Sequence, residues 1–160
     1  MNTRNRIPIN NFSEQDAIYI AGLFDGEGSI NLSKLSRKSK GEVGKTSTYL
    51  LRARIRMTDK NIVDWLRVTI GGCYYFYTAS KRPNQKVCHE WNVSGRNAID
   101  FIKRIYPYLK IKRLQADVAF KFGETIDKGD MYIQRLSDSV INLRQNCRDD
   151  MLVLNKRGLN

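Results

Sequence analysis

The chain has 160 residues, of which 41% are hydrophobic, and this suits one folded domain better than a disordered chain. Its 28 lysines and arginines outnumber 16 acids, and the net charge of +12 favours a polyanionic partner such as nucleic acid, although a generic basic protein has the same balance. Three cysteines without a CxxC pair, together with a single histidine, argue against a structural zinc site and against a disulfide framework.

The N-terminal segment is polar, so we expect residues 1–12 to form an arm and not a secretory signal. The longest apolar run stops at Asp25 and is too short to cross a bilayer, so no membrane partner is expected. Reduced, packed thiols favour an intracellular protein, either in an organelle or in a prokaryotic cytoplasm. We treat residues 1–160 as a single domain, with a core over 13–147 and a C-terminal tail over 148–160.

The first predicted element is a helix that begins at Glu14, because Ser13 before it is a good N-cap residue. Apolar residues then recur at the spacing of a helix face, namely Ala17, Ile20, Ala21 and Phe24. Gly26 and Gly28 end this helix.

Two strands are predicted next, on either side of a charged, glycine-containing loop over residues 38–45. In the first strand, Ile30 and Leu32 alternate with polar residues. In the second, the apolar residues Leu51, Ala53, Ile55 and Met57 alternate with Arg52, Arg54 and Arg56. Since strand side chains point to opposite faces with period two, one face is apolar and the other is a row of three arginines.

The rest of the chain predicts a second helix after Asp59 and two more strands around a turn at Pro83. A third helix runs from about Gly95 to near Pro107, and further helices are predicted over 112–122 and 131–147. The core order is helix, two strands, helix, two strands, helix. Strand pairs this short form hairpins, so we expect an α+β domain in which helices cover one face of an antiparallel sheet.

Residues 20–28, Ile-Ala-Gly-Leu-Phe-Asp-Gly-Glu-Gly, resemble the signature of the LAGLIDADG homing endonucleases. A second stretch, residues 107–116, resembles the Leu-Lys-x-Lys block that follows the sheet in this family. The two matches lie about eighty positions apart, and the element order agrees with the family's. The resemblance therefore covers most of the chain, and it implies a saddle-shaped DNA-binding sheet.

The first helix also carries a nearly side-chain-free stripe, on which a second copy of the same helix could pack closely about a two-fold axis. Because the chain has one motif, the resemblance implies the intron-encoded, homodimeric type, in which each chain supplies one of the two sites that a double-strand cut needs. The residues that we assign to the dimer interface are Ala21, Gly22, Asp25 and Gly26.

Two acids, Asp25 and Glu27, lie at the predicted helix end, where backbone carbonyls already concentrate negative charge. Taken alone, such an acid-glycine cluster is more often a helix stop with solvated acids than a catalytic site. The resemblance implies that the Glu27 side chain and the Gly26 carbonyl hold Mg²⁺ (or Mn²⁺) and that Glu27 is catalytic, with no small-molecule cofactor. It also implies a catalytic role for Lys112, which without the resemblance is as readily a surface lysine.

A two-stranded ribbon fits the DNA major groove, and arginine can grip guanine or a phosphate with two hydrogen bonds. The side-chain parity of the second hairpin is open, because Tyr74 and Phe76 could take the place of Tyr75 and Tyr77. The residues that we assign to contact with double-stranded DNA are Asn31, Ser33, Arg37, Arg52, Arg54, Arg56, Tyr75, Tyr77, Glu90 and Asn92, with Lys81 and Arg82 on backbone phosphates.

The resemblance implies a site-specific endonuclease that hydrolyses both strands of a long, roughly palindromic DNA target with a divalent metal and thereby promotes the mobility of its host intron. One position departs from the family: many members have a glutamine at the end of the second strand, where this chain has Met57-Thr58. Two alternatives remain open, a maturase that assists group I intron splicing and a DNA-binding regulator that does not cut.

Overall fold

The computed structural model describes residues 9–37, 46–77, 86–126 and 136–156. Its first helix, α1 (Glu14–Glu27), begins where predicted, because the Ser13 hydroxyl accepts a hydrogen bond from the Asp16 amide at 3.1 Å. Gly28 follows as the C-cap residue, and its amide donates to the carbonyl of Phe24. The motif therefore spans the C-terminal half of α1 and the first residue of the next strand.

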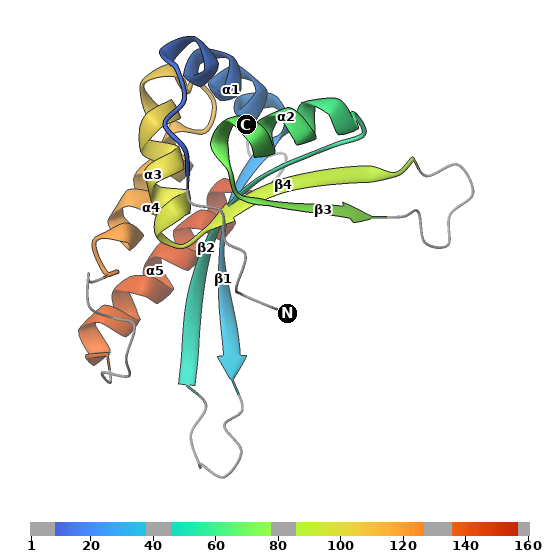
Figure 1. Ribbon diagram of the computed structural model, residues 1–160. Helices are drawn as coiled ribbons and strands as arrows, with labels where there is room; N and C mark the ends of the chain where they lie inside the picture. The colour runs from blue at the N-terminus through green and yellow to red at the C-terminus, as the bar shows by residue number, and fades with distance from the viewer. Residues whose placement is uncertain (1–8, 38–45, 78–85, 127–135, 157–160) are drawn as a thin grey trace.

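The described strands form one antiparallel sheet of four strands in the order β1-β2-β4-β3. Their bounds are β1 (Gly28–Arg37), β2 (Thr46–Met57), β3 (Cys73–Tyr77) and β4 (Cys88–Ser94). Both predicted hairpins are present, and the pairing of β2 with β4 joins them at the centre of the sheet. The hairpins diverge from this centre, which gives the sheet its saddle shape (Figure 1).

The remaining helices are α2 (Lys60–Ile70), α3 (Arg96–Ile105), α4 (Arg113–Gly123) and α5 (Asp138–Leu154), with a short 3-10 helix, η2 (Tyr106–Tyr108). The helices gather on one side of the strands and leave the other side open (Figure 1). The predicted α+β class, with helices on one face of an antiparallel sheet, is thus confirmed. None of the described helices is both long enough and apolar enough to cross a membrane.

The core lies between the helices and the covered face of the sheet. Trp91 on β4 is fully buried, and its ring meets that of Phe101 on α3 edge to face, with the ring centres 4.8 Å apart. The Trp91 indole also donates to the carbonyl of Gly71 at 2.7 Å. Gly72, with φ of 92°, packs so close to β4 that a Cβ would lie 2.8 Å from the Val93 side chain. Glycine at the end of α2 thus allows this helix to close onto the sheet.

The last helix differs from the prediction at both ends, since we expected it over 131–147 and it spans Asp138–Leu154. Ser137 caps its start, and the buried Met151 extends its apolar face beyond residue 147. The Asn155 side chain then donates to the carbonyl of Ile30 at 2.8 Å, which fixes the end of the helix against β1. Residues 148–154, which we assigned to a tail, are therefore helical, while 131–135 lie outside the described residues.

Candidate active site and nucleic-acid interface

The C-terminal end of α1 exposes a carboxylate. Glu27 is the last residue of the helix, and its side chain makes no hydrogen bond or ion pair with any described residue. Gly26 before it is also exposed. The final carbonyls of a helix lack partners within the helix, so this end offers oxygen donors from both the backbone and a side chain.

Asp25, the other acid of the motif, points inward and is 9% exposed. Its two carboxylate oxygens accept hydrogen bonds from the backbone amides of Lys110, at 2.7 Å, and Lys112, at 3.0 Å. One carboxylate thus ties the segment between η2 and α4 to the end of α1. This contact explains why the two motifs, about eighty positions apart in the sequence, meet in the fold.

Lys112 is half-buried beside this contact, and its ammonium group donates to the carbonyl of Asp25. Burial lowers the pKa of Lys112, although the negative charges of Asp25 and Glu27 act in the opposite direction. Lys112 is therefore not a freely solvated surface lysine. Its positive charge is held at the same helix end as the Glu27 carboxylate.

The donors at this helix end suit a hard divalent cation such as Mg²⁺, which prefers oxygen ligands. Within the described ranges there is no group of three His, Cys, Asp or Glu side chains that could enclose a metal. Mg²⁺ does not require such a cage, since it keeps several waters and commonly uses one or two carboxylates together with substrate phosphates. The Glu27 side chain and the Gly26 carbonyl fit that pattern.

The outer side of α1 carries two of the three glycines of the motif. Gly22 and Gly26 are exposed, and a Cβ built on either would meet nothing within 4 Å. Ile18, one turn before Gly22, is 52% exposed and borders the same stripe. Sequence analysis missed Ile18, although its spacing of four residues from Gly22 could have indicated it.

Two residues that we assigned to the dimer interface do not lie on this outer stripe. Ala21 is 0% exposed and belongs to the core, and Asp25 is buried by its contact with the segment before α4. Positions 21 and 25 share the inner face of α1, whereas 22 and 26 share the outer face. The exposed part of the stripe is therefore formed by the glycines, and the placement of Ala21 and Asp25 was wrong.

The open face of the sheet carries the arginine row. Leu51, Ala53 and Ile55 are buried on the covered face, so the intervening arginines project to the other side. Arg52 pairs with Asn31 and Arg54 with Ser29, and partners opposite each other share a face. Ser33 is exposed on β1. Arg37 is the last residue of β1, and its side chain lies outside the described part of the chain.

The register of the second hairpin shows which side chains of β3 lie on the same face as the arginines. Arg56 pairs with Glu90, which in turn pairs with Tyr75, so these side chains share one face of the sheet. Tyr75 and Tyr77 thus lie on the arginine face, 39% and 45% exposed. The alternative with Tyr74 and Phe76 on this face is wrong. Two predicted phosphate contacts, Lys81 and Arg82, lie outside the described residues.

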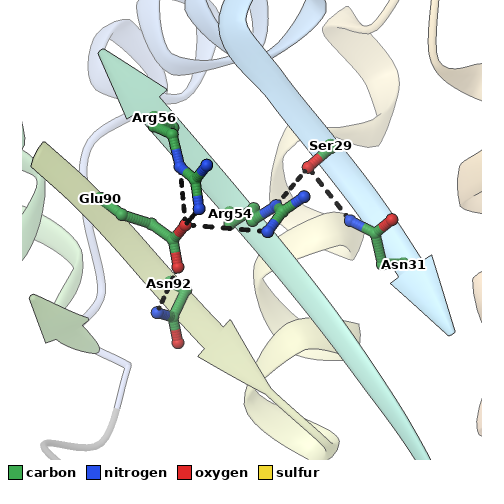
Figure 2. Close-up of polar contacts among 6 residues, drawn as sticks. All are labelled: Ser29, Asn31, Arg54, Arg56, Glu90 and Asn92. Atoms are coloured by element: carbon green, nitrogen blue, oxygen red, sulfur yellow. Dashed lines mark hydrogen bonds and ion pairs between the residues drawn. The ribbon is translucent and has the colours of Figure 1, made fainter. Parts of the chain in front are cut away.

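Glu90 and Asn92 lie on the arginine face but beneath its surface, 1% and 6% exposed. One oxygen of Glu90 accepts hydrogen bonds from Nε and Nη2 of Arg56, at 3.1 and 2.8 Å, and lies 3.8 Å from Nη1 of Arg54. The other oxygen accepts from the Asn92 amide at 3.1 Å. Figure 2 shows the carboxylate turned toward both arginines. In this arrangement Glu90 is not a surface contact, contrary to our prediction.

Two more contacts fix the arginines. Nε of Arg54 donates to the Ser29 hydroxyl at 2.9 Å, and the Asn31 amide donates to the same oxygen at 3.1 Å (Figure 2). The Arg56 guanidinium lies over the Tyr77 ring, 4.4 Å from its centre. The hydrogen bonds that Arg56 donates to the Glu90 carboxylate raise the pKa of Arg56. Ser29 was missed by sequence analysis because its role depends on the pairing of β1 with β2.

Comparison with known proteins gives a family match over most of the chain. A family model described as LAGLIDADG endonuclease matches residues 20–127. This range includes the end of α1, the whole sheet and the segment that carries Lys112. Among curated protein sequences, no match to the chain is found.

Several solved structures have the same fold. The homing endonuclease I-CvuI in complex with its target matches with a TM-score of 0.70 and 18% identity over 92% of this chain and 86% of that chain. The archaeal intron-encoded homing endonuclease I-Vdi141I, complexed with DNA, matches with a TM-score of 0.68 and 13% identity over 92% and 88%. I-SmaMI bound to cleaved DNA matches with a TM-score of 0.61 and 19% identity over 97% of this chain but 50% of that chain.

Proposed function

The chain belongs to the LAGLIDADG endonuclease family, and from this premise we propose that it is a homing endonuclease that hydrolyses both strands of a long, roughly palindromic DNA target with a divalent metal. The observation that carries this proposal is the end of α1, where the Glu27 carboxylate, which has no partner among the described residues, lies near the tethered Lys112 ammonium. A cut in DNA that lacks the host intron would promote the mobility of that intron.

The chemistry follows from the groups at this helix end. Glu27 and the Gly26 carbonyl would hold Mg²⁺ or Mn²⁺. The bound cation would lower the pKa of an attacking water and offset the charge that develops on the phosphate. Lys112 adds a positive charge that its contact with the Asp25 carbonyl holds in place, so it can stabilise a phosphate without reorganisation. Asp25 acts indirectly, by keeping the Lys112 segment against α1.

One chain supplies one such centre, and a double-strand cut needs two. The open stripe at Gly22 and Gly26 supports a homodimer, because two helices can approach closely where neither carries a side chain. A two-fold axis through this contact would relate two sheets and two Glu27 carboxylates. The target would then be roughly palindromic, as for other symmetric DNA-binding dimers.

The open face of the sheet supports binding of double-stranded DNA. This face carries every second side chain of β2, namely Arg52, Arg54 and Arg56. Asn31 and Ser33 on β1 flank them. Arginine pairs well with guanine O6 and N7 in the major groove, and the polar side chains beside it can contact other base edges. Tyr75 and Tyr77 extend the same face along the second hairpin.

The decisive variant is Glu27→Gln, tested on a library of plasmids that carry randomised duplex sites, with and without Mg²⁺. The wild type should give double-strand cuts at one sequence family, and the variant should give none while still binding the same sites. The fold of the variant should be at least as stable, because an acid at a helix C-terminus costs about 0.3–1 kcal/mol.

The matched control is Glu124→Gln, which makes the same change at the exposed end of α4 and should leave cutting intact. A Glu27→Gln protein that cuts at the wild-type rate, or a wild type that cuts equally well in EDTA, would contradict the proposed mechanism.

The end of β2 favours one second candidate, a maturase that binds intron RNA. Met57 packs against the core and Thr58 is exposed, so this strand end offers only the Thr58 hydroxyl where many family members have a glutamine. Competition between a structured group I intron RNA and a duplex DNA library would separate the two functions. A clear preference for the duplex would count against the maturase.

A further inference from the structure

Glu90 is a buried carboxylate at a position where the fold does not require a charged side chain. Its side chain is 2% exposed although its register with Arg56 places it on the open face of the sheet, opposite the face that the described helices cover. Its carboxylate pairs with Arg54 and Arg56, whose side chains remain 35% and 44% exposed themselves. A buried carboxylate is costly unless it is paired, and an apolar residue would fill the same space without that cost.

The contacts leave part of each guanidinium group without a partner among the described residues. Arg56 directs Nε and Nη2 to Glu90 and rests on the Tyr77 ring, so Nη1 and the outer end of the fork have no partner among the described residues. Arg54 directs Nε to Ser29 and turns Nη1 toward Glu90, which leaves Nη2 at its outer end. Both arginines are thus held by partners on neighbouring strands (Figure 2), and each keeps one terminal nitrogen without a hydrogen bond or ion pair to a described residue.

The pairing also changes the charge of this surface. Two guanidinium groups and one carboxylate leave a net charge of about +1, instead of +2 without Glu90. Sequence-independent attraction to DNA depends mainly on the number of phosphates that positive charges neutralise. Direct reading of a base depends instead on where the donors point. A buried carboxylate at this place weakens the first effect and strengthens the second.

We infer that Glu90 is a positioning residue for sequence recognition, which aims the outer ends of Arg54 and Arg56 at base edges and limits their attraction to arbitrary phosphates. Glu90 does not contact DNA itself. The inference rests on the proposed function, because it assumes that the open face of the sheet binds duplex DNA.

The test begins with a randomised duplex library, from which the wild-type protein selects a consensus in Ca²⁺ without cutting. Affinities are then measured for the consensus duplex and for a scrambled duplex of the same length and composition. Glu90→Gln should bind the scrambled duplex several-fold more tightly and reduce the ratio of the two affinities by roughly tenfold. The salt dependence on the scrambled duplex should become steeper, with a slope larger by up to about 0.9, as one more phosphate is neutralised.

Asp64→Asn is the matched control, because it removes one negative charge from an exposed ion pair with Lys60 on α2, a helix on the covered side of the sheet. It should leave the affinity ratio unchanged. Arg56→Lys provides a second route should Glu90→Gln fold poorly. Lysine keeps the positive charge and a partner for Glu90 but lacks the planar, forked donors of arginine. The variant should therefore discriminate less between consensus and altered base pairs, and it should not bind the scrambled duplex more tightly.

Two results would overturn the inference alone: a selective wild type whose affinity ratio is unchanged in both variants, or equal losses on both duplexes with a lower melting temperature. The second would indicate a purely structural role for Glu90. A wild type that selects no sequence from the library would overturn the proposed function, and the inference with it.

Discussion

The two faces of the sheet bury side chains by different means. On the covered face, Ile30, Leu51 and Trp91 are fully buried beneath helices, and apolar area removed from water stabilises their positions. On the open face, Glu90 is just as inaccessible, and its carboxylate pairs with two arginines instead. The first arrangement holds the fold together. The second arrangement has a desolvation cost and contributes little to the stability of the fold. A role in binding a ligand therefore explains it better than a role in folding.

Helix α1 repeats this contrast between its inner and outer sides. Ala21 and Phe24 are fully buried against the rest of the domain, while Gly22 and Gly26 face outward with open space above them. The inner side is decided by packing within one chain. On the outer side, no described residue packs against the two glycines, and such a stripe is typical of helices that pair closely with another helix.

The largest effect is expected on the covered face. Trp91→Ala should lower the free energy of unfolding by about 3–5 kcal/mol, because it leaves a large cavity beside Phe101 and the Gly71 carbonyl without its donor. Chemical denaturation would measure this. The affinity of the folded protein for DNA, corrected for the fraction that is unfolded, should change little. A variant of near wild-type stability would mean that the two faces do not differ as described.

A change on the open face should affect DNA binding and leave the stability of the fold nearly unchanged. Arg52→Ala should weaken binding to the selected duplex by about 1–3 kcal/mol while the free energy of unfolding stays within about 0.5 kcal/mol of the wild type. Fluorescence anisotropy and thermal melting would give the two quantities. The control is Arg67→Ala, which removes the same charge from an exposed position on α2. If both variants weaken DNA binding equally, the open face contributes only its positive charge and no specific contact.

The smallest effect is expected at the outer side of α1. Gly22→Ala should stabilise the isolated chain by about 0.5–1 kcal/mol, since alanine is the better helix former and its Cβ meets nothing within 4 Å. Self-association, measured by sedimentation, should nevertheless weaken. Gly28→Ala is the counterpart, because its Cβ would lie 2.4 Å from the Phe24 ring and should destabilise the chain itself. Unchanged association of Gly22→Ala would contradict pairing through this stripe.

Several features of the fold could be predicted from short stretches of sequence. Ser13 and Asp59 cap helices as expected, because capping depends on one side chain and the next amides. The arginine row was predictable because alternation along β2 fixes which side chains share a face. The C-terminal end of α5 was not, since it depends on the burial of Met151 and on the contact of Asn155 with β1. Its start was missed, although the cap at Ser137 is of the same local kind.

The sequence by itself determined the family, the helix end that carries Glu27 and the face of β2 that carries the arginines, because these follow from local spacing. Only the tertiary structure decided that β4 lies between β2 and β3, which brings Glu90 to Arg54 and Arg56 across 34 or more positions of the chain. It likewise decided that Asp25 points inward to Lys112. Periodicity reports which side a residue faces, whereas the identity of its neighbour depends on how distant segments pair.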